Sequence, residues 1–256
     1  MTTRDWDAAT YQRVSDPQFH WGLAVLERLP LRGDETVLDA GCGTGRVTAE
    51  LMRRLPRGRV VAVDASPSMV ERAREALGRG AEVFVADLAD LRLEEPVDAI
   101  LSTAVFHWIP DHERLFQRLH DALKPGGLLV AQCGGTGNVE RFHARLWEVA
   151  RCAPFAEHFD GWAGPWNFAA PEETAARLER AGFAEVRCSL EPKPFAPPEP
   201  RDFMRTVCLG HHLERLPPEL RDQFVEAVHD HTPKPVELDY VRLNIDARRP
   251  DPARWP

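Results

Sequence analysis

The stretch Val37-Leu38-Asp39-Ala40-Gly41-Cys42-Gly43-Thr44-Gly45 decides the fold class. It joins a short apolar run to a glycine-rich turn, and the amphipathic segment 46–55 follows directly. This order predicts a buried strand, a tight turn and a helix. Glycines in such a turn let the backbone approach a ligand closely and adopt φ values that other residues avoid. We therefore expect a ligand to bind where this strand ends.

The same alternation continues along the chain and predicts a parallel sheet with helices on both faces. Strand-like runs cover residues 59–64, 82–87, 98–103 and 126–132, and amphipathic stretches cover 66–77 and 112–123. The strand-like runs are apolar almost throughout, as expected for strands that are buried on both sides. Ser66-Pro67 is typical of a helix start, and Pro125-Gly126-Gly127 predicts the stop of a helix that ends near Lys124.

Beyond residue 132 the pattern changes. Residues 134–168 are rich in glycine and aromatics and contain one helical segment without a strand-like run, so we expect an insertion lying over the sheet's edge. The later segments are predicted as a helix at 171–183, a strand at 184–190, helices around 203–216 and 219–231, and a last strand within 236–249. We expect one domain, made of an N-terminal helical cap (1–30), a ligand-binding core (31–133), a lid insertion (134–170) and a segment that completes the sheet and carries a helical insertion (171–256).

Composition excludes several classes of function. The formal net charge of −8 and the absence of a Lys/Arg cluster argue against a nucleic-acid partner. Five scattered cysteines without a CxxC pair disfavour a disulfide framework and favour the cytoplasm. No run approaches the roughly 18 apolar residues of a membrane span, so we expect a soluble protein without a membrane partner. His211, His212, His229 and His231 lack the spacing of a metal motif, and no metal is expected.

Two acidic residues follow the next two predicted strands, Asp64 and Asp87. The glycine spacing GxGxG differs from the dinucleotide fingerprint GxGxxG and from a phosphate loop, which favours a nucleoside with a short charged tail. The Asp64 carboxylate is placed to accept both hydroxyls of a ribose. Asp87 is placed to accept an adenine amino group while the Leu88 amide meets a ring nitrogen. Each aspartate alone is also typical of a helix cap.

Several motifs together carry a family resemblance. DAGCGTG (39–45), the Asp64 strand end, VADL (85–88) and LKPGG (123–127), in this order, resemble the class I S-adenosylmethionine-dependent methyltransferases. A closer similarity, to the trans-aconitate methyltransferase branch, rests on a second set of segments. These are Trp6, Tyr11, VDASPSMVERAR (63–74), STAVFHWIPDHERLFQRLHDALKPGGLLVAQ (102–132) and DYVRLNIDARR (239–249). Members of that branch esterify small carboxylic acids.

The resemblance implies a Rossmann-like, doubly wound, mostly parallel seven-stranded sheet with an antiparallel last strand and helical lid insertions. It implies S-adenosyl-L-methionine as cofactor, S-adenosyl-L-homocysteine as product, and O-methylation of a small carboxylate-bearing molecule by a monomer or homodimer. The cofactor contacts that it implies are Tyr11, Asp39, Gly41, Gly43, Asp64, Ala65, Met69, Asp87, Leu88 and Ser102. Where that branch tends to carry Arg-x-Arg-Pro, this chain has Val14-Ser15-Asp16-Pro17.

His107 and Trp108 follow the fourth predicted strand and are the candidate catalytic residues. A carboxylate acceptor is already a nucleophile and needs no general base, so we expect His107 to position it, although a structural histidine fits the same pattern. Trp162, Trp166 and Phe168 form the wall of an apolar pocket or hold the insertion on the core. The alternatives are N-, C- or carrier-bound acyl methylation, a non-catalytic cofactor-binding subunit and a nicotinamide-dependent oxidoreductase. The last is disfavoured by the glycine spacing.

Overall fold

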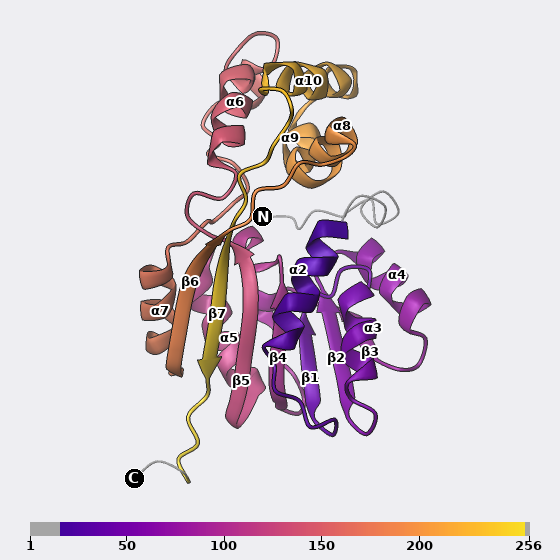
Figure 1. Ribbon diagram of the computed structural model, residues 1–256, viewed down its shortest axis with the longest axis vertical. Helices are drawn as coiled ribbons and strands as arrows, with labels where there is room; N and C mark the ends of the chain where they lie inside the picture. The colour runs from indigo at the N-terminus through magenta and orange to yellow at the C-terminus, as the bar shows by residue number, and fades with distance from the viewer. Residues whose placement is uncertain (1–15, 254–256) are drawn as a thin grey trace.

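The computed structural model describes residues 16–253, which form a seven-stranded sheet with the order β3-β2-β1-β4-β5-β7-β6 (Figure 1). The strands are β1 (Thr36–Ala40), β2 (Arg59–Asp64), β3 (Glu82–Val85), β4 (Val97–Thr103), β5 (Leu123–Gly134), β6 (Ala184–Pro192) and β7 (Val241–Arg248). Strands β1 to β5 pair in parallel, and β7 runs antiparallel to both of its neighbours, β5 and β6. The predicted fold class is therefore confirmed.

Helices cover both faces of the sheet. They are α2 (Asp16–Glu27), α3 (Arg46–Arg53) and α4 (Pro67–Leu77) on one face, and α5 (His112–Ala122) and α7 (Pro171–Arg180) on the other. Leu115 and Phe116 of α5 pack with Leu178 of α7 against the sheet. Leu26 of α2 and Leu51 of α3 pack on the opposite face. Burial of apolar surface on both faces, at about 25 cal/mol per Å², is the main stabilisation of this layer arrangement.

Two predicted helix boundaries lie close to the observed ones. Ser66 caps α4 as predicted, because its hydroxyl accepts the N–H of Met69 and Pro67 occupies the first turn. The helix predicted to end near Lys124 is α5, which ends at Ala122. The following residues begin β5 with an irregularity: the strand pairs at 123, and regular pairing resumes at Leu128. Proline lacks the N–H that a regular ladder needs, so this stretch bulges out of the sheet.

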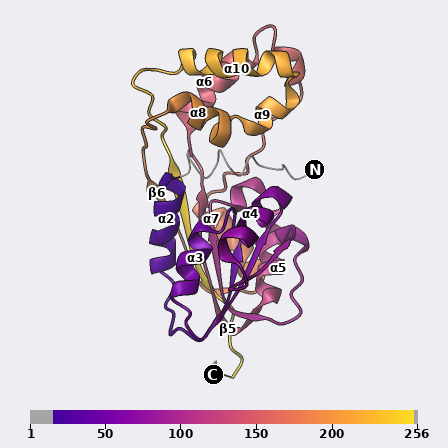
Figure 2. The same ribbon diagram turned by 90° about the vertical axis from the view of Figure 1, so that its right-hand side faces the viewer.

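A helical cap lies beyond the carboxyl ends of the parallel strands (Figures 1 and 2). It consists of α6 (Glu140–Ala150), α8 (Pro200–Phe203), a π-helical turn (Met204–Cys208), α9 (Gly210–Arg215) and α10 (Pro218–His231). The insertion therefore does not lie over the sheet's edge as expected. Its helix α6 packs with α10 through Phe142 and Phe224, since two separate amphipathic segments bury their apolar faces together.

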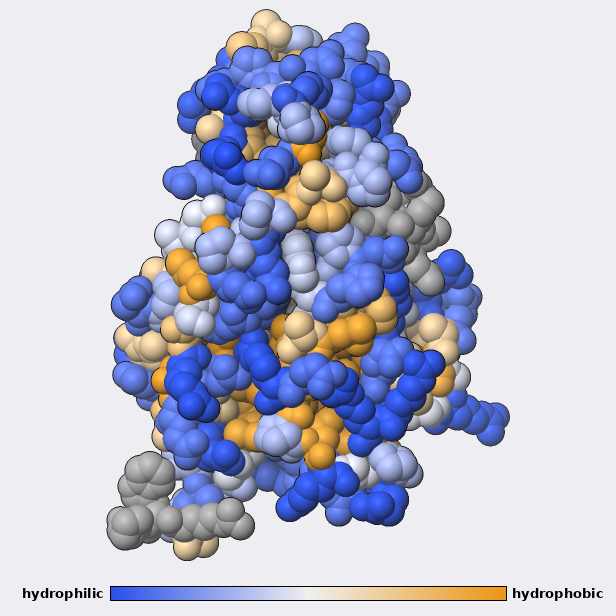
Figure 3. Space-filling view, in the orientation of Figure 1, coloured by the Kyte–Doolittle hydropathy of each residue, from blue (hydrophilic) through white to orange (hydrophobic). Residues whose placement is uncertain are grey.

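The surface in the view of Figure 3 is mainly hydrophilic over the cap, in keeping with an apolar interior shared by its helices. Among residues 16–253, no helix combines the length and apolar character needed to cross a bilayer.

Candidate active site

A cavity of about 610 Å³ lies between the carboxyl ends of the strands and the cap. Most of the predicted site residues line it: Gly41, Gly43, Asp64, Ala65, Met69, Asp87, Leu88, His107 and Trp108. They come from the ends of β1, β2, β3 and β4 and from the turns that follow. In open α/β sheets a ligand binds just outside these strand ends, so the fold brings the predicted residues to the expected place.

Two predicted cofactor contacts, Asp39 and Ser102, are not among the lining residues. Tyr11, like Trp6, lies outside the described residues. Asp39 and Ser102 are each only 1% exposed and support the glycine turn from behind. The Asp39 carboxylate accepts the Thr48 hydroxyl at 2.7 Å, and the Ser102 hydroxyl donates to the Ala40 carbonyl at 2.7 Å. Burial, with a smaller effect of the nearby Asp64 charge, raises the pKa of Asp39 to about 6. Both side chains are thus bound within the protein.

The backbone geometry of the turn explains why glycine is needed at positions 41 and 43. Gly41 has φ +88°, and a Cβ there would come within 2.1 Å of Val105. Gly43 has φ +53°, but a Cβ on it would meet no described atom within 4 Å, and the residue lines the cavity. The space over Gly43 is therefore open to a ligand rather than filled by protein.

Asp64 and Asp87 both line the cavity, and both accept hydrogen bonds from backbone N–H groups. The Asp64 carboxylate accepts the N–H groups of Gly43 and Ser66, each at 2.9 Å, which joins the glycine turn to the start of α4. Asp87 accepts the N–H of Ala89 at 2.9 Å and caps a short 3₁₀ turn. Each carboxylate oxygen has more than one lone pair, so these bonds leave acceptor capacity for ligand hydroxyl or amino groups. The capping role and the ligand role are compatible.

His107 is 7% exposed and has its protonation state fixed by its surroundings. Its Nδ1 lies 3.2 Å from the backbone nitrogen of Gly134 and accepts that N–H. Burial, followed by the charge of Arg242 and the nearby His112, holds the pKa of His107 well below its usual range. The neutral ring must then carry its proton on Nε2, which has no hydrogen-bond partner among the described residues. His107 can donate a hydrogen bond to a ligand.

The cavity is completed by residues that the sequence interpretation missed, foremost Arg242 near the start of β7. Arg242 is 3% exposed, pairs in the sheet with Gly134, and places its guanidinium 5.2 Å from the Trp21 ring centroid. Its alternation with the buried Leu243 could have indicated that it lies on the other face of the strand. Sequence alone does not give the register that brings Arg242 beside Gly134 and so into the neighbourhood of His107.

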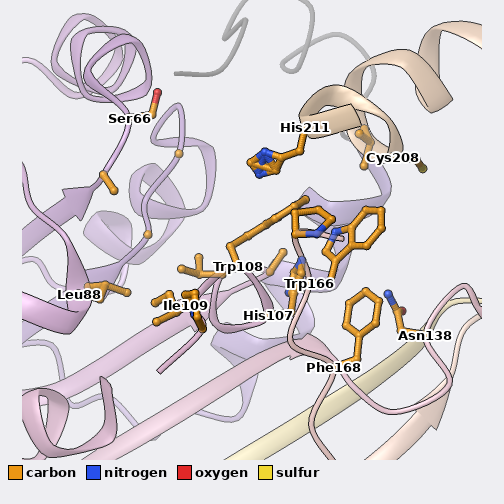
Figure 4. A pocket seen from close by; sticks show the side chains of 18 of the residues that line it. Ser66, Leu88, His107, Trp108, Ile109, Asn138, Trp166, Phe168, Cys208 and His211 are labelled. Atoms are coloured by element: carbon orange, nitrogen blue, oxygen red, sulfur yellow. The ribbon is translucent and has the colours of Figure 1, made fainter. Parts of the chain in front are cut away.

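The cap supplies the upper wall of the cavity (Figure 4). His211 of α9 meets the Trp108 ring edge-on, with 4.9 Å between ring centroids. Trp166 and Phe168 of the insertion lie beside His107 and Trp108, and His107 is 5.7 Å from Phe168. Ser66 and Leu88 stand on the opposite side, at the strand ends. The cavity therefore has one half built by the sheet turns and another built by the cap.

Comparison with known proteins agrees with this geometry. Residues 37–127 match the model of a methyltransferase domain. A trans-aconitate 2-methyltransferase of Methylobacterium radiotolerans is 33% identical over 228 residues, which cover 87% of each chain. The chain belongs to the trans-aconitate methyltransferase family. Another such enzyme, from Rhodopseudomonas palustris, is 37% identical to this methyltransferase over 80% of this chain and 69% of its own.

The fold of the methyltransferase is shared more widely. A phosphoethanolamine N-methyltransferase of Haemonchus contortus, solved with S-adenosylhomocysteine and phosphomonomethylethanolamine, superposes with a TM-score of 0.63. It is 19% identical, and the match covers 95% of this chain and 57% of that one, a similarity that shows the fold alone. With the family match, this chain is an S-adenosylmethionine-dependent methyltransferase.

Proposed function

We propose that this methyltransferase transfers a methyl group to a carboxylate oxygen of a small molecule. One observation carries the proposal: the single basic nitrogen of neutral His107 is already occupied by the N–H of Gly134. A carboxylate is ionised and nucleophilic at neutral pH, so its methylation requires no general base. The names of the related trans-aconitate 2-methyltransferases support the same class of acceptor.

The residues at the strand ends fit the cofactor. The open space over Gly43 accommodates a methionine tail, and Asp64 offers charged acceptors to ribose hydroxyls. Leu88 and Met69 add apolar wall for an adenine ring, with Asp87 beside it. S-adenosylmethionine bound there would supply a methyl group on a positively charged sulfur. The acceptor oxygen would bond to the methyl carbon as the carbon–sulfur bond breaks, and S-adenosylhomocysteine would leave.

The cap half of the cavity positions the acceptor. The Nε2–H of His107 donates to one carboxylate oxygen, and the Arg242 guanidinium supplies positive charge on the same side. Trp108 and Trp166 exclude water from the reacting oxygen, which removes hydration that would slow its attack. Holding the acceptor in reacting geometry is the main catalytic contribution that these residues make.

His107 does not serve the alternative acceptors as a base. An amine or carbon acid must lose a proton, and the Nδ1 of His107 is not available to take it. The Arg242 charge also disfavours an ammonium group in the cavity. The acidic composition and five free cysteines support a cytoplasmic enzyme that acts on free small molecules rather than nucleic acid, as a monomer or homodimer.

The test is a product analysis. The protein is incubated with S-adenosylmethionine and separate sets of small carboxylates, amines and phenols, and S-adenosylhomocysteine release is measured together with the product mass. We expect methyl esters, which alkaline hydrolysis returns to the acid. Turnover with amines or phenols but with no carboxylate contradicts the proposal.

A further inference from the structure

The acceptor half of the cavity is walled by flat rings in a nearly parallel arrangement (Figure 4). The Trp166 and Phe168 planes are within 13° of each other, with centroids 5.9 Å apart. The His143 ring stacks on both, 4.3 Å from Trp166 and 5.6 Å from Phe168. All three residues line the cavity, so a ligand in this half meets ring faces and edges. Aromatic surfaces of this kind favour flat partners in stacked or edge-on contact.

This wall carries no charge near neutral pH. Burial lowers the pKa of His143 to about 4, and behind it the buried His212 has a pKa lowered to about 3. Neutral imidazoles in an aromatic surrounding behave as further flat, weakly polar rings. A charged ligand group pressed against this wall would lose its hydration without gaining an opposite charge.

Cationic groups are few in this half of the cavity. Within the described part of the chain, the lysine and arginine residues that line it are Arg242 and Arg215. Arg215 is exposed, stacks its guanidinium 4.9 Å from the Trp162 ring centroid and donates from Nε to the His158 carbonyl, so it stands at the rim. The neighbouring Glu214, also a lining residue, adds negative charge at that rim. Arg242 is the buried cation, and it offers one carboxylate a partner.

We propose that the acceptor is a monocarboxylate on a flat apolar body, such as an aryl-substituted unsaturated acid. The inference rests on the proposed carboxylate methylation and narrows it. The carboxylate lies against Arg242 and His107, and the flat body lies along Trp166 and Phe168. The π-helical turn adds Val207 and Cys208 to the same apolar wall, an irregular backbone form that is frequent at functional sites.

The first test measures binding without turnover. The full chain is saturated with S-adenosylhomocysteine and titrated by calorimetry with trans-cinnamate, octanoate and trans-aconitate. We expect trans-cinnamate to bind at least about tenfold more tightly than the other two, because octanoate is flexible and trans-aconitate carries three carboxylates. Equal or tighter binding of octanoate or trans-aconitate overturns the inference, as does failure of trans-cinnamate to bind.

The second test uses variants of the ring wall. We expect Trp166→Leu and Phe168→Leu each to weaken trans-cinnamate binding about tenfold while leaving S-adenosylhomocysteine affinity unchanged. Trp147→Leu is the control, since Trp147 belongs to the same cap and contacts Trp162 but does not line the cavity. If thermal melting shows that the Trp166 variant does not fold, cinnamate binding by the Phe168 variant alone decides whether the inference stands. Unchanged cinnamate binding in a folded wall variant overturns the inference.

The same assays separate this inference from the function on which it depends. If carboxylates are methylated and trans-aconitate is the best acceptor, only the inference of a flat monocarboxylate is refuted. The proposed carboxylate methylation is then retained. Methylation of amines, with trans-cinnamate bound but not methylated, refutes the carboxylate function itself.

Discussion

The Nδ1 atom of His107 accepts the backbone N–H of Gly134 at 3.2 Å, and this contact ties the turn after β4 to the end of β5. It fixes the neutral tautomer of His107 and leaves Nε2 as a donor. From the sequence we expected a residue that positions the acceptor rather than a base. The structure favours a neutral donor in that positioning role, because burial and the Arg242 charge both oppose protonation of the ring.

Substitution of His107 tests this tautomer. In His107→Gln the amide oxygen can accept the Gly134 N–H while the amide nitrogen donates, so we expect a loss of about tenfold in kcat/KM, equivalent to about 1.4 kcal/mol. His107→Leu leaves the Gly134 N–H without an acceptor and should cost more in both activity and stability. Because the pKa of His107 is lowered, titration of this residue should not change the wild-type rate at pH values above the usual histidine pKa of about 6.5. A loss of 10² or more in His107→Gln, with an acid limb that disappears in the variant, would show that His107 is a base.

Asp64→Asn tests the cofactor half of the cavity. The amide retains an oxygen for one of the Gly43 and Ser66 N–H groups but loses the charge offered to ribose, so we expect binding of S-adenosylhomocysteine to weaken by about 1 to 3 kcal/mol. Calorimetric titration measures this. Asp98→Asn is the control, because Asp98 also accepts a backbone N–H, from Thr36, at the amino ends of the strands. Unchanged affinity in Asp64→Asn removes Asp64 from the ligand site.

Gly43→Val tests whether the space over the glycine turn belongs to the cofactor. We expect at least about a hundredfold loss of S-adenosylhomocysteine affinity, since the branched side chain occupies open cavity, together with some backbone strain at φ +53°. Gly78 provides a matched control, because it has φ +58° and similarly open space but does not line the cavity. Gly78→Val should lower the melting temperature through strain alone and leave binding intact. Equal binding losses in both variants would show a general effect of strain.

The buried His212 predicts acid sensitivity of the cap. Neither ring nitrogen of His212 has a hydrogen-bond partner within the described part of the chain, and burial lowers its pKa to about 3. The unfolded chain, with a histidine pKa of about 6.5, binds more protons than the folded one between these values, so stability falls as pH drops below 6.5. At pH 5 this amounts to about 2 kcal/mol.

His212→Leu removes this proton uptake and should flatten the dependence of the unfolding free energy on pH between 7 and 5. Denaturant unfolding at several pH values measures the slope. His20→Asn, at an exposed position of α2, should retain the wild-type slope. An unchanged slope in His212→Leu would show that other groups cause the acid sensitivity.

The sequence predicted the features that depend on local pattern. The strands β1 to β5, the cap of α4 by Ser66 and the ligand turn at Gly41 and Gly43 follow from apolar runs and glycine spacing over a few residues. The position of Asp39 was less predictable, because a strand-end carboxylate can face either the ligand or the interior, and only packing places it against Thr48.

The cap half of the site depends on contacts between distant segments, which no local pattern specifies. His143 and His211 come from separate helices, α6 and α9, whose apolar residues share one core with those of α10. Arg242 reaches the cavity through the register of β7 on β5, in which Leu128 pairs with Arg248. A one-residue change of that register would place Arg242 on the other face of the sheet.

The position of β7 between β5 and β6 has a consequence for synthesis on the ribosome. Strands β1 to β5 emerge first and can pair in parallel with one another, whereas the free edge of β5 stays unpaired until residues 241–248 have been made. An unpaired strand edge of this kind can pair with other chains. The turns that fit the cofactor are encoded before β7, and Arg242 lies within it. Nascent chains that stop before β7 therefore contain the cofactor turns but lack the Arg242 guanidinium, to which we assign acceptor binding.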